Sequence, residues 1–430
     1  MRVALINPAW TFEHSIYFGC REPHLPLELG YAHALLQAHG HESLMLDGAL
    51  DQLDAEALAG VVKGFAPDMV VITTAPSYLF WRCAPPELRV PRDMIARLGG
   101  TGALRVLIGP HGSTTPGVAL RKSGAEVVLQ GECEDAILAL ASSGGNPSHV
   151  RGAAWLDRAG KLKTNGGPQA TRFADAPALR WSDTWIARHA HHHHRFDAPP
   201  AGPGAEVEAS RGCPYSCTFC AKIDFRDSYR RRQLDLLLAE IDGLIAQDVR
   251  YLYFIDEIFL PQRPLLEALC QRDIRFGIQT RIDLWKPDLI RLLGDAGCVS
   301  IEAGVESLTV EGRAALDKNC RMTTEELTAR LILARRHVPF VQANLILSTG
   351  DDAEQIAAWR RTLQQEGVWA NDPVPLFPYP GSPDYRVRWG MPDDHAWERA
   401  HAHYLAQFDR MSDIQETAPL PLPELECLAC

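Results

Sequence analysis

Three cysteines near the middle of the chain, Cys213, Cys217 and Cys220, have the spacing Cys-x-x-x-Cys-x-x-Cys. A loop of this length can turn three thiolates toward one centre. Thiolates select iron–sulfur clusters, zinc or copper(I) among the common metals. Zinc stays open, because a fourth ligand could come from elsewhere in the chain. Three thiolates on a four-iron cluster leave one iron open for chemistry. Three buried cysteines without a metal are the alternative, which this spacing and the Gly-Cys-Pro turn disfavour.

The residues around the cysteines extend this pattern. Arg211-Gly212 precedes the first cysteine and Phe219 precedes the last. The whole loop strongly resembles that of the radical S-adenosylmethionine (SAM) enzymes. The resemblance implies a 4Fe-4S cluster whose metal ligands and catalytic residues are the three cysteines. It also implies SAM at the open iron and an external one-electron donor such as flavodoxin or ferredoxin.

The elements that position the loop predict a partial (β/α)6 barrel over residues 205–385. Alternating strand and helix patterns give six units, without the length for eight. Barrels of this type place chemistry at the carboxyl ends of their strands, and the cysteine loop follows the first strand. The expected strands are Val207–Ser210, Tyr251–Ile255, Ile274–Gln279, Val299–Gly304, Val341–Leu347 and Val374–Phe377.

Polar residues at these strand ends suit SAM. Its ammonium and ribose need carboxylates or carbonyls, and its carboxylate needs an arginine or backbone amides. For any single carboxylate, a structural salt bridge is the alternative. Arg226 and Arg230, after the loop, are expected to be solvated or paired, or else to hold an anionic group. The expected SAM-binding residues are Phe219, Asp256, Glu257, Gln279, Arg281, Glu302, Glu306 and Ser307.

Residues 1–145 predict a Rossmann-like parallel α/β sheet, whose ligand would bind beyond the carboxyl ends of the strands. No Gly-x-Gly-x-x-Gly fingerprint or Walker loop is present, which weakens a dinucleotide or nucleotide interpretation. The domain resembles the cobalamin-binding domain of one large class of radical SAM enzymes. The stretches that carry the resemblance are Asn7-Pro8, Pro26–Gly30, Ile72–Thr74, Gly109–His111 and Gly131–Glu134.

The resemblance implies cobalamin contacts at these strand ends, and a sheet that only packs is the alternative. The motif Asp-x-His-x-x-Gly is absent, so no histidine is expected to ligate cobalt from below in that usual way. His111 is either a hydrogen-bonded loop residue or a contact to the nucleotide tail of the corrinoid. The expected contacts are Asn7, Thr73, Thr74, Ser77, Tyr78, Gly109, His111, Gly112, Gln130, Gly131 and Glu132.

Two further segments complete the domain plan. Residues 146–204 predict a connector with a small hairpin and the histidine-rich run His189–His194. The run is expected to be a solvated linker, with a part in a substrate pocket as the alternative. A metal site is disfavoured, because no carboxylate or cysteine stands at a fixed spacing. Residues 386–430 are expected to cap the barrel, and Cys427 and Cys430 to lie in an exposed tail.

The composition of the chain limits which binding partners and which cellular location are expected. The chain has 430 residues and a net charge of −11, which argues against a nucleic-acid partner held through its phosphates. No apolar run reaches the roughly 18 residues of a transmembrane helix. No signal peptide is evident, so a cytoplasmic location is expected. Eleven cysteines then indicate metal or catalysis, not a disulfide framework.

Together the resemblances imply a cobalamin-dependent radical SAM enzyme that methylates an unactivated carbon of a small-molecule or glycan-type substrate. In that mechanism the cluster splits SAM, the adenosyl radical takes a hydrogen from the substrate, and methylcobalamin donates a methyl group. A second SAM remethylates the cobalt. The first alternative is a cyclase or ring-rearranging enzyme with the same cofactors. The second is a non-catalytic corrinoid or iron–sulfur sensor.

Overall fold

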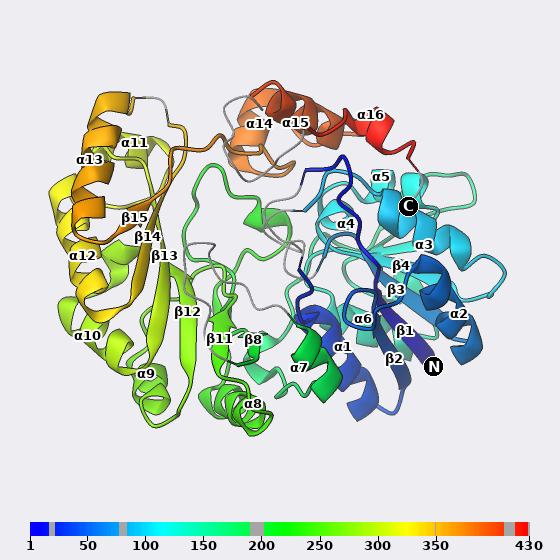
Figure 1. Cartoon of the computed structure of the whole chain (residues 1–430). Helices are drawn as coiled ribbons and strands as arrows, with labels where there is room; N and C mark the ends of the chain where they lie inside the picture. The colour runs from blue at the N-terminus through cyan, green and yellow to red at the C-terminus, as the bar shows by residue number, and fades with distance from the viewer. Residues whose placement is uncertain (17–21, 77–83, 190–201, 349, 408–417, 429–430) are drawn as a thin grey trace.

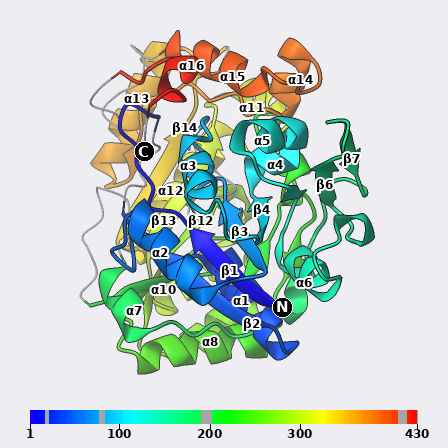
Figure 2. The same ribbon diagram turned by 90° about the vertical axis from the view of Figure 1, so that its right-hand side faces the viewer.

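The computed structural model describes residues 1–16, 22–76, 84–189, 202–348, 350–407 and 418–428. Two α/β units lie side by side, and a helical C-terminal segment runs across one end of both (Figure 1). Figure 2, a quarter turn away, shows the same helices above both sheets. Among the described residues, no helix has the length and apolar character needed to cross a membrane.

The first unit is built on a seven-stranded sheet with the order β2-β1-β3-β4-β5-β6-β7. The first five strands in this order are parallel, while β6 and β7 add an antiparallel hairpin. The expected connector hairpin is therefore part of the first sheet. The strands are β1 (Arg2–Asn7), β2 (Glu42–Asp47), β3 (Met69–Thr73), β4 (Leu104–Ile108), β5 (Val127–Leu129), β6 (Ala153–Leu156) and β7 (Leu162–Thr164).

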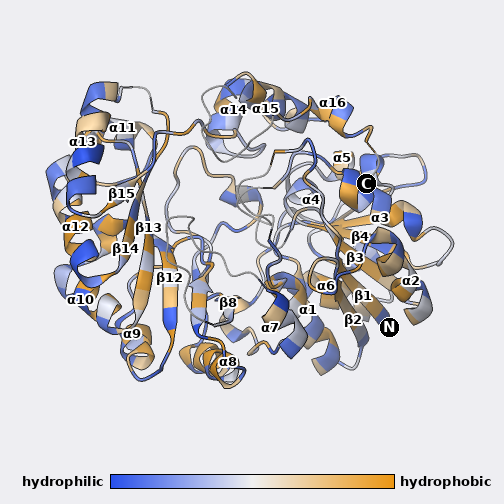
Figure 3. Cartoon of the chain, in the orientation of Figure 1, coloured by the Kyte–Doolittle hydropathy of each residue, from blue (hydrophilic) through white to orange (hydrophobic). Residues whose placement is uncertain are grey.

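Helices cover both faces of this sheet, which explains why most side chains of its central strands are apolar. Alternate side chains of β3 pack on opposite sides: Val71 faces a cluster with Leu29 of α1, and Ile72 faces one with Val62 of α2. Figure 3 shows the hydrophobic colour concentrated on these strands. The helices are α1 (Leu27–Ala38), α2 (Ala55–Phe65), α3 (Arg89–Arg97), α4 (Pro110–Thr114), α5 (Pro116–Ser123) and α6 (Glu134–Ser142).

The second unit is a six-stranded, wholly parallel sheet with the order β15-β14-β13-β12-β11-β8. Together with the first sheet it confirms the predicted fold class. The strands are β8 (Gly204–Val207), β11 (Tyr251–Phe254), β12 (Arg275–Thr280), β13 (Cys298–Glu306), β14 (Phe340–Leu345) and β15 (Trp369–Ala370). The helices are α8 (Leu234–Ala246), α9 (Arg263–Leu269), α10 (Pro287–Asp295), α11 (Val310–Ala315), α12 (Thr324–His337) and α13 (Ala353–Gln365).

Two expected strands of this unit were wrong in position. The sixth strand is β15, and Val374 makes only an isolated bridge with Ile346. The first strand ends at Val207, before the expected Ser210. Ser210 begins β9 (Ser210–Arg211), which pairs antiparallel with β10 (Arg230–Arg231). Glu208, the residue that follows β8, pairs with two arginines, as described next.

Buried ion pairs join the two units. Arg226 Nη1 lies 2.7 Å from Glu208 and 3.1 Å from Glu257, and its Nη2 lies 3.0 Å from Glu28 of α1. Arg211 contacts the other oxygen of Glu208 at 2.7 Å and Glu134 of α6 at 2.5 Å. We call these six residues the interface network. All six side chains are at most 7% exposed, so each charge depends on its partners for stabilisation.

An apolar core also spans the junction. α7 (Asp183–Arg188), in the connector, contributes Trp185 to a cluster that contains Tyr31 of α1 and Val207 of β8. The C-terminal helices are α14 (Pro383–Trp389), α15 (Ala396–Leu405) and α16 (Leu422–Leu425). Trp397 of α15 packs with Ala75 and Ala84 of the first unit, so this segment covers more than the barrel.

Replacing Arg226 with Met should lower the free energy of unfolding, because it breaks the interface network. Removing one partner of a buried ion pair leaves uncompensated charge and typically costs about 3–5 kcal/mol. Arg263→Met is the matched control, since Arg263 and its partner Asp288 are 50% and 57% exposed. Pairs of that kind contribute about 0–1 kcal/mol. Urea unfolding would measure both, and equal losses would contradict a structural role for the network.

Candidate active site

The cysteine loop is fixed at several points of its backbone. Gly212 N donates to Glu257 Oε2 at 2.7 Å, and Lys222 Nζ donates to the carbonyl of Cys213 at 2.7 Å. Thr218 N donates to the carbonyl of Leu316 at 3.0 Å. Gly212 has φ +76°, and a Cβ there would lie 2.1 Å from the carbonyl oxygen of Ser228. Only glycine fits this turn, which explains the Arg-Gly-Cys start of the loop.

A cavity of about 440 Å³ lies in front of the loop, at the carboxyl ends of β11, β12 and β13. All three cysteines of the loop line it, and all three are free thiols. Burial raises the pKa of each of these thiols, and raises that of Cys220 to about 12. A metal centre therefore has to displace protons to bind here. Three thiols that line one partly closed cavity are a donor set that suits a 4Fe-4S cluster.

Five of the eight expected SAM-binding residues line this cavity: Phe219, Glu257, Gln279, Arg281 and Glu306. The Arg281 guanidinium lies 4.0 Å from the ring centroid of Tyr215 and 2.8 Å from Asp283. Gln279 Oε1 is buried without a hydrogen-bond partner among the described residues. The cavity thus holds carboxylates, an amide and a guanidinium around the thiols.

The other three expected SAM-binding residues lie outside the cavity lining. Asp256 accepts hydrogen bonds from Ala209 N and from the Ser210 hydroxyl, and burial raises its pKa well above the usual range. Glu302 accepts from the Tyr253 hydroxyl at 3.3 Å. Ser307 donates to Asp351 at 2.8 Å. Each side chain has a structural contact in the second unit, the alternative that the sequence left open.

Lys318 and Tyr215 also line the cavity but were not among the expected site residues. Lys318 Nζ lies 3.0 Å from Glu306 Oε1, and its charge acts to lower the pKa of Cys217. Tyr215 lies inside the cysteine motif, so its place in the sequence could have predicted that it lines the cavity. Lys318 follows a short helix at no characteristic spacing, so nothing in the local sequence marks it.

The expected cobalamin contacts gather at the carboxyl edge of the first sheet. The strand order reverses between β1 and β3, which is where open α/β sheets bind ligands. There Thr73 Oγ1 donates to Asn7 Oδ1 at 3.0 Å. Thr74 Oγ1 and Gln130 Oε1 are buried and have no hydrogen-bond partner within the described part of the chain. These two atoms fit a polar ligand at this edge. Ser77 and Tyr78 lie outside the described residues.

The remaining expected cobalamin contacts have close partners within the protein. The rings of His111 and Trp397 stack with centroids 4.0 Å apart, and burial lowers the pKa of His111 to about 3. Glu132 pairs with Arg230. The three glycines allow tight packing: Gly109 has φ +121°, a Cβ on Gly112 would meet Val128 at 2.5 Å, and Gly131 lies against the backbone of Gln169.

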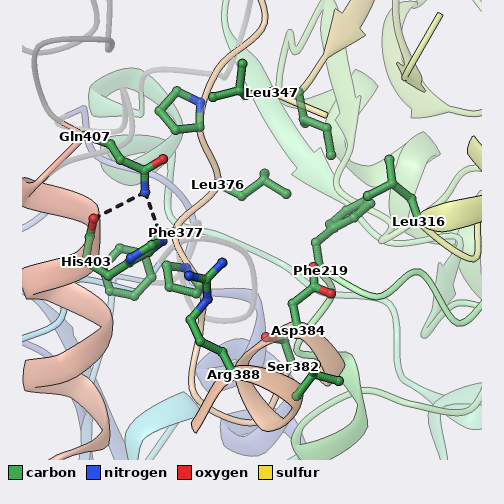
Figure 4. A pocket seen from close by; sticks show the side chains of 14 residues that line it. Phe219, Leu316, Leu347, Leu376, Phe377, Ser382, Asp384, Arg388, His403 and Gln407 are labelled. Carbon is green, nitrogen blue, oxygen red and sulfur yellow. Dashed lines mark hydrogen bonds between the residues drawn. The ribbon is translucent and has the colours of Figure 1, made fainter. Parts of the chain in front are cut away.

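A second pocket, which we call the outer pocket, adjoins the cysteine cavity. It measures about 430 Å³ and shares Phe219, Pro375, Leu376 and Phe377 with that cavity. Figure 4 shows Arg388 pointing from α14 toward its middle, between Phe219 and the pair His403 and Gln407. No described residue forms an ion pair with Arg388, so its guanidinium is available to an anionic group.

Comparison with known proteins agrees with this geometry. Residues 207–363 match the family model of the radical SAM superfamily. An uncharacterized methyltransferase of Pyrococcus horikoshii is 22% identical over 71% of this chain and 66% of its own length. An anaerobic magnesium-protoporphyrin IX monomethyl ester cyclase of Cereibacter sphaeroides is 23% identical over 86% of this chain and 60% of its own length. The chain thus spans under two thirds of these relatives.

A solved structure shares the arrangement of both units. It is the radical SAM methyltransferase TsrM from Kitasatospora setae, with cobalamin and a [4Fe-4S] cluster bound. The TM-score is 0.71 at 17% identity, over 89% of this chain and 76% of TsrM, which shows a common fold. The sequence match over 207–363 covers the cysteine loop and the strands that surround the cavity. The resemblance predicted from the cysteine loop is confirmed: residues 207–363 of this chain match the radical SAM superfamily.

Proposed function

We propose that this protein is a cobalamin-dependent radical SAM enzyme that methylates an unactivated carbon of a small molecule. The observation that carries the proposal is the way the cysteine cavity meets the first unit. Phe225 and Arg226 line the cavity; Phe225 also packs into the core of the first sheet, and Arg226 pairs with Glu28. Tyr379, on the cavity wall, donates to the carbonyl of Ala84 at 3.2 Å.

A corrinoid at the carboxyl edge of the first sheet would therefore face the cysteine cavity. Thr74 and Gln130 are the side chains with buried oxygens to offer it. Bound there, the cofactors would supply the reductive cleavage of SAM by the cluster and a methyl group carried on cobalt. TsrM, which shares the fold, is described as a methyltransferase with cobalamin bound, and this supports the same assignment here.

The chain's own residues hold and orient the reactants. Cys213, Cys217 and Cys220 hold the cluster. Glu257 and Glu306 face the cavity as acceptors for the SAM ammonium and ribose, and Arg281 as a donor to its carboxylate. Phe219, Leu376 and Phe377 form an apolar wall that limits water between the cysteine cavity and the outer pocket.

The outer pocket is the proposed substrate site, because it adjoins the cysteine cavity and is lined by both apolar and polar groups. Its 430 Å³ suits a small molecule better than an extended glycan. Arg388, which has no acidic partner among the described residues, would hold a carboxylate or phosphate of the substrate. The apolar wall would then contact the carbon to be methylated.

A second candidate function is cyclisation with the same cofactors. The observation in its favour is that the Cereibacter sphaeroides relative, which matches 86% of this chain, is described as a cyclase. Cyclisation and methylation differ in the mass of the product, because only methylation adds one methylene unit.

The direct test uses protein purified without oxygen, with the cluster reconstituted and hydroxocobalamin supplied. Iron and corrinoid are quantified, and SAM is added with a strong reductant. Methylation predicts bound corrinoid and formation of both 5′-deoxyadenosine and S-adenosylhomocysteine. Iron and 5′-deoxyadenosine without bound corrinoid would contradict the cobalamin assignment. Absence of both 5′-deoxyadenosine and S-adenosylhomocysteine would favour a non-catalytic binding protein.

Two substitutions separate the cluster from the SAM site. Cys217→Ala should remove the iron and the visible absorbance of the cluster, since the two remaining thiolates cannot hold it.

Arg281→Ala should keep the iron but weaken SAM binding by about tenfold or more, as expected for loss of a charge-assisted hydrogen bond of about 1.5–3 kcal/mol. Cys270→Ala, at an exposed free thiol, is the matched control for the first. Full iron in Cys217→Ala, or unchanged SAM affinity in Arg281→Ala, would remove that residue from the site.

The outer pocket has its own test. Acid-bearing compounds that stabilise the protein in thermal unfolding should lose that effect in Arg388→Gln, and their neutral amides should never show it. Arg361→Gln, on the exposed face of α13, is the control with the same change of charge. If acids stabilise the wild type and Arg388→Gln equally, they do not bind through Arg388.

A further inference from the structure

Two histidines and a glutamate meet at the junction of the two units, outside the lining of both pockets. His24 precedes α1, His189 follows α7, and Glu206 belongs to β8. His24 Nδ1 lies 2.7 Å from Glu206 Oε1, and His189 Nε2 lies 2.6 Å from Glu206 Oε2. The three side chains are 7%, 0% and 1% exposed.

The composition of this group is unusual for a protein interior. Charged and imidazole side chains are costly to bury unless they are paired or bind a metal. Here one carboxylate contacts two imidazoles, one on each oxygen, and also accepts from Leu25 N at 3.3 Å. The two imidazole rings lie edge to face, with centroids 6.0 Å apart. The apolar residues Ala205 and Val207 on either side of Glu206 belong to the surrounding core.

We propose that His24, His189 and Glu206 form a binding site for a divalent first-row transition metal ion, Zn²⁺ in the first instance. Neutral imidazole and carboxylate are ligands that zinc accepts together. One ligand atom from each residue can be chosen so that all three lie within 4.8 Å of one another. The three residues come from the N-terminal segment, the connector and the barrel, so a bound ion would join these parts covalently through coordination bonds.

Binding an ion requires the imidazoles to move, because they contact different oxygens of Glu206. Zinc–nitrogen and zinc–oxygen bonds of about 2.0–2.2 Å place neighbouring tetrahedral ligand atoms about 3.3 Å apart. The nitrogen–oxygen distances of 2.6 and 2.7 Å are shorter, so both imidazoles have to withdraw from the carboxylate to admit an ion. Coordination would then replace the contacts to Glu206 with bonds to the ion.

This site is separate from the cluster and from cobalamin, so its test uses an element that neither contains. Reconstituted wild-type protein is equilibrated with Zn²⁺ and desalted, and zinc is measured beside iron and cobalt. We expect about one zinc per chain beyond any bound by thiolates. The zinc X-ray absorption spectrum should show nitrogen and oxygen neighbours at about 2.0–2.2 Å, whereas thiolate-bound zinc has sulfur at about 2.3 Å.

Variants then locate the ion. His24→Ala and Glu206→Gln should lose the zinc with nitrogen and oxygen ligands, while Cys217→Ala should keep it. His401→Ala is the matched control, because His401 is a fully buried histidine elsewhere in the fold. Zinc with sulfur neighbours alone, or no zinc at all in the wild-type protein, would overturn the proposal and leave a hydrogen-bonded contact. Because the histidine run 191–194 can also bind zinc through nitrogen, the loss of zinc in Glu206→Gln decides the location, and circular dichroism checks that this variant folds.

Discussion

The structure depends on the buried ion pairs that Arg211 and Arg226 make with carboxylates of both units. Guanidinium and carboxylate groups lose several kcal/mol of solvation on burial, and only close pairing offsets that loss. Within this network, Glu28 and Glu134 of the first unit pair only with arginines of the second unit, which also carries Glu208 and Glu257. The two units are therefore held in one relative position by electrostatic complementarity as well as by their shared apolar core.

This constraint extends to the cysteine loop through Glu257. One oxygen of its carboxylate accepts from Arg226 at 3.1 Å, and the other accepts from Gly212 N at 2.7 Å. The start of the loop is thus fixed to the end of β11 and, through Arg226, to α1. A loop positioned in this way has little freedom to shift when its ligands bind, and the proposed radical chemistry requires preorganisation of that kind.

The C-terminal segment adds a second connection between the units. Trp397 stacks on His111 of the first unit and donates from Nε1 to Thr115 Oγ1 at 3.1 Å. On its other side Ser382 and Arg388 line the outer pocket beside Phe219 of the cysteine loop. The same short segment therefore closes the first unit and shapes the proposed substrate site, so changes in it could alter substrate choice without altering the cofactor cavity.

Local sequence determined the cysteine loop, the glycine turn before it, the fold class and most strands, because these follow from short-range spacing and from burial on two faces. Tertiary structure decided which polar residues meet. Asp256 and Ser307 stand at strand ends like Glu257 and Glu306, yet their side chains bond within the second unit. Arg226 finds Glu28, 198 residues away, and His24 finds Glu206, 182 residues away. The sequence around the histidine run contains no carboxylate at a fixed spacing. The carboxylate that His189 contacts is that of Glu206, which lies on β8. The spacing of residues in the sequence does not predict such pairs. Their stabilisation arises only when both groups are buried together in the folded core.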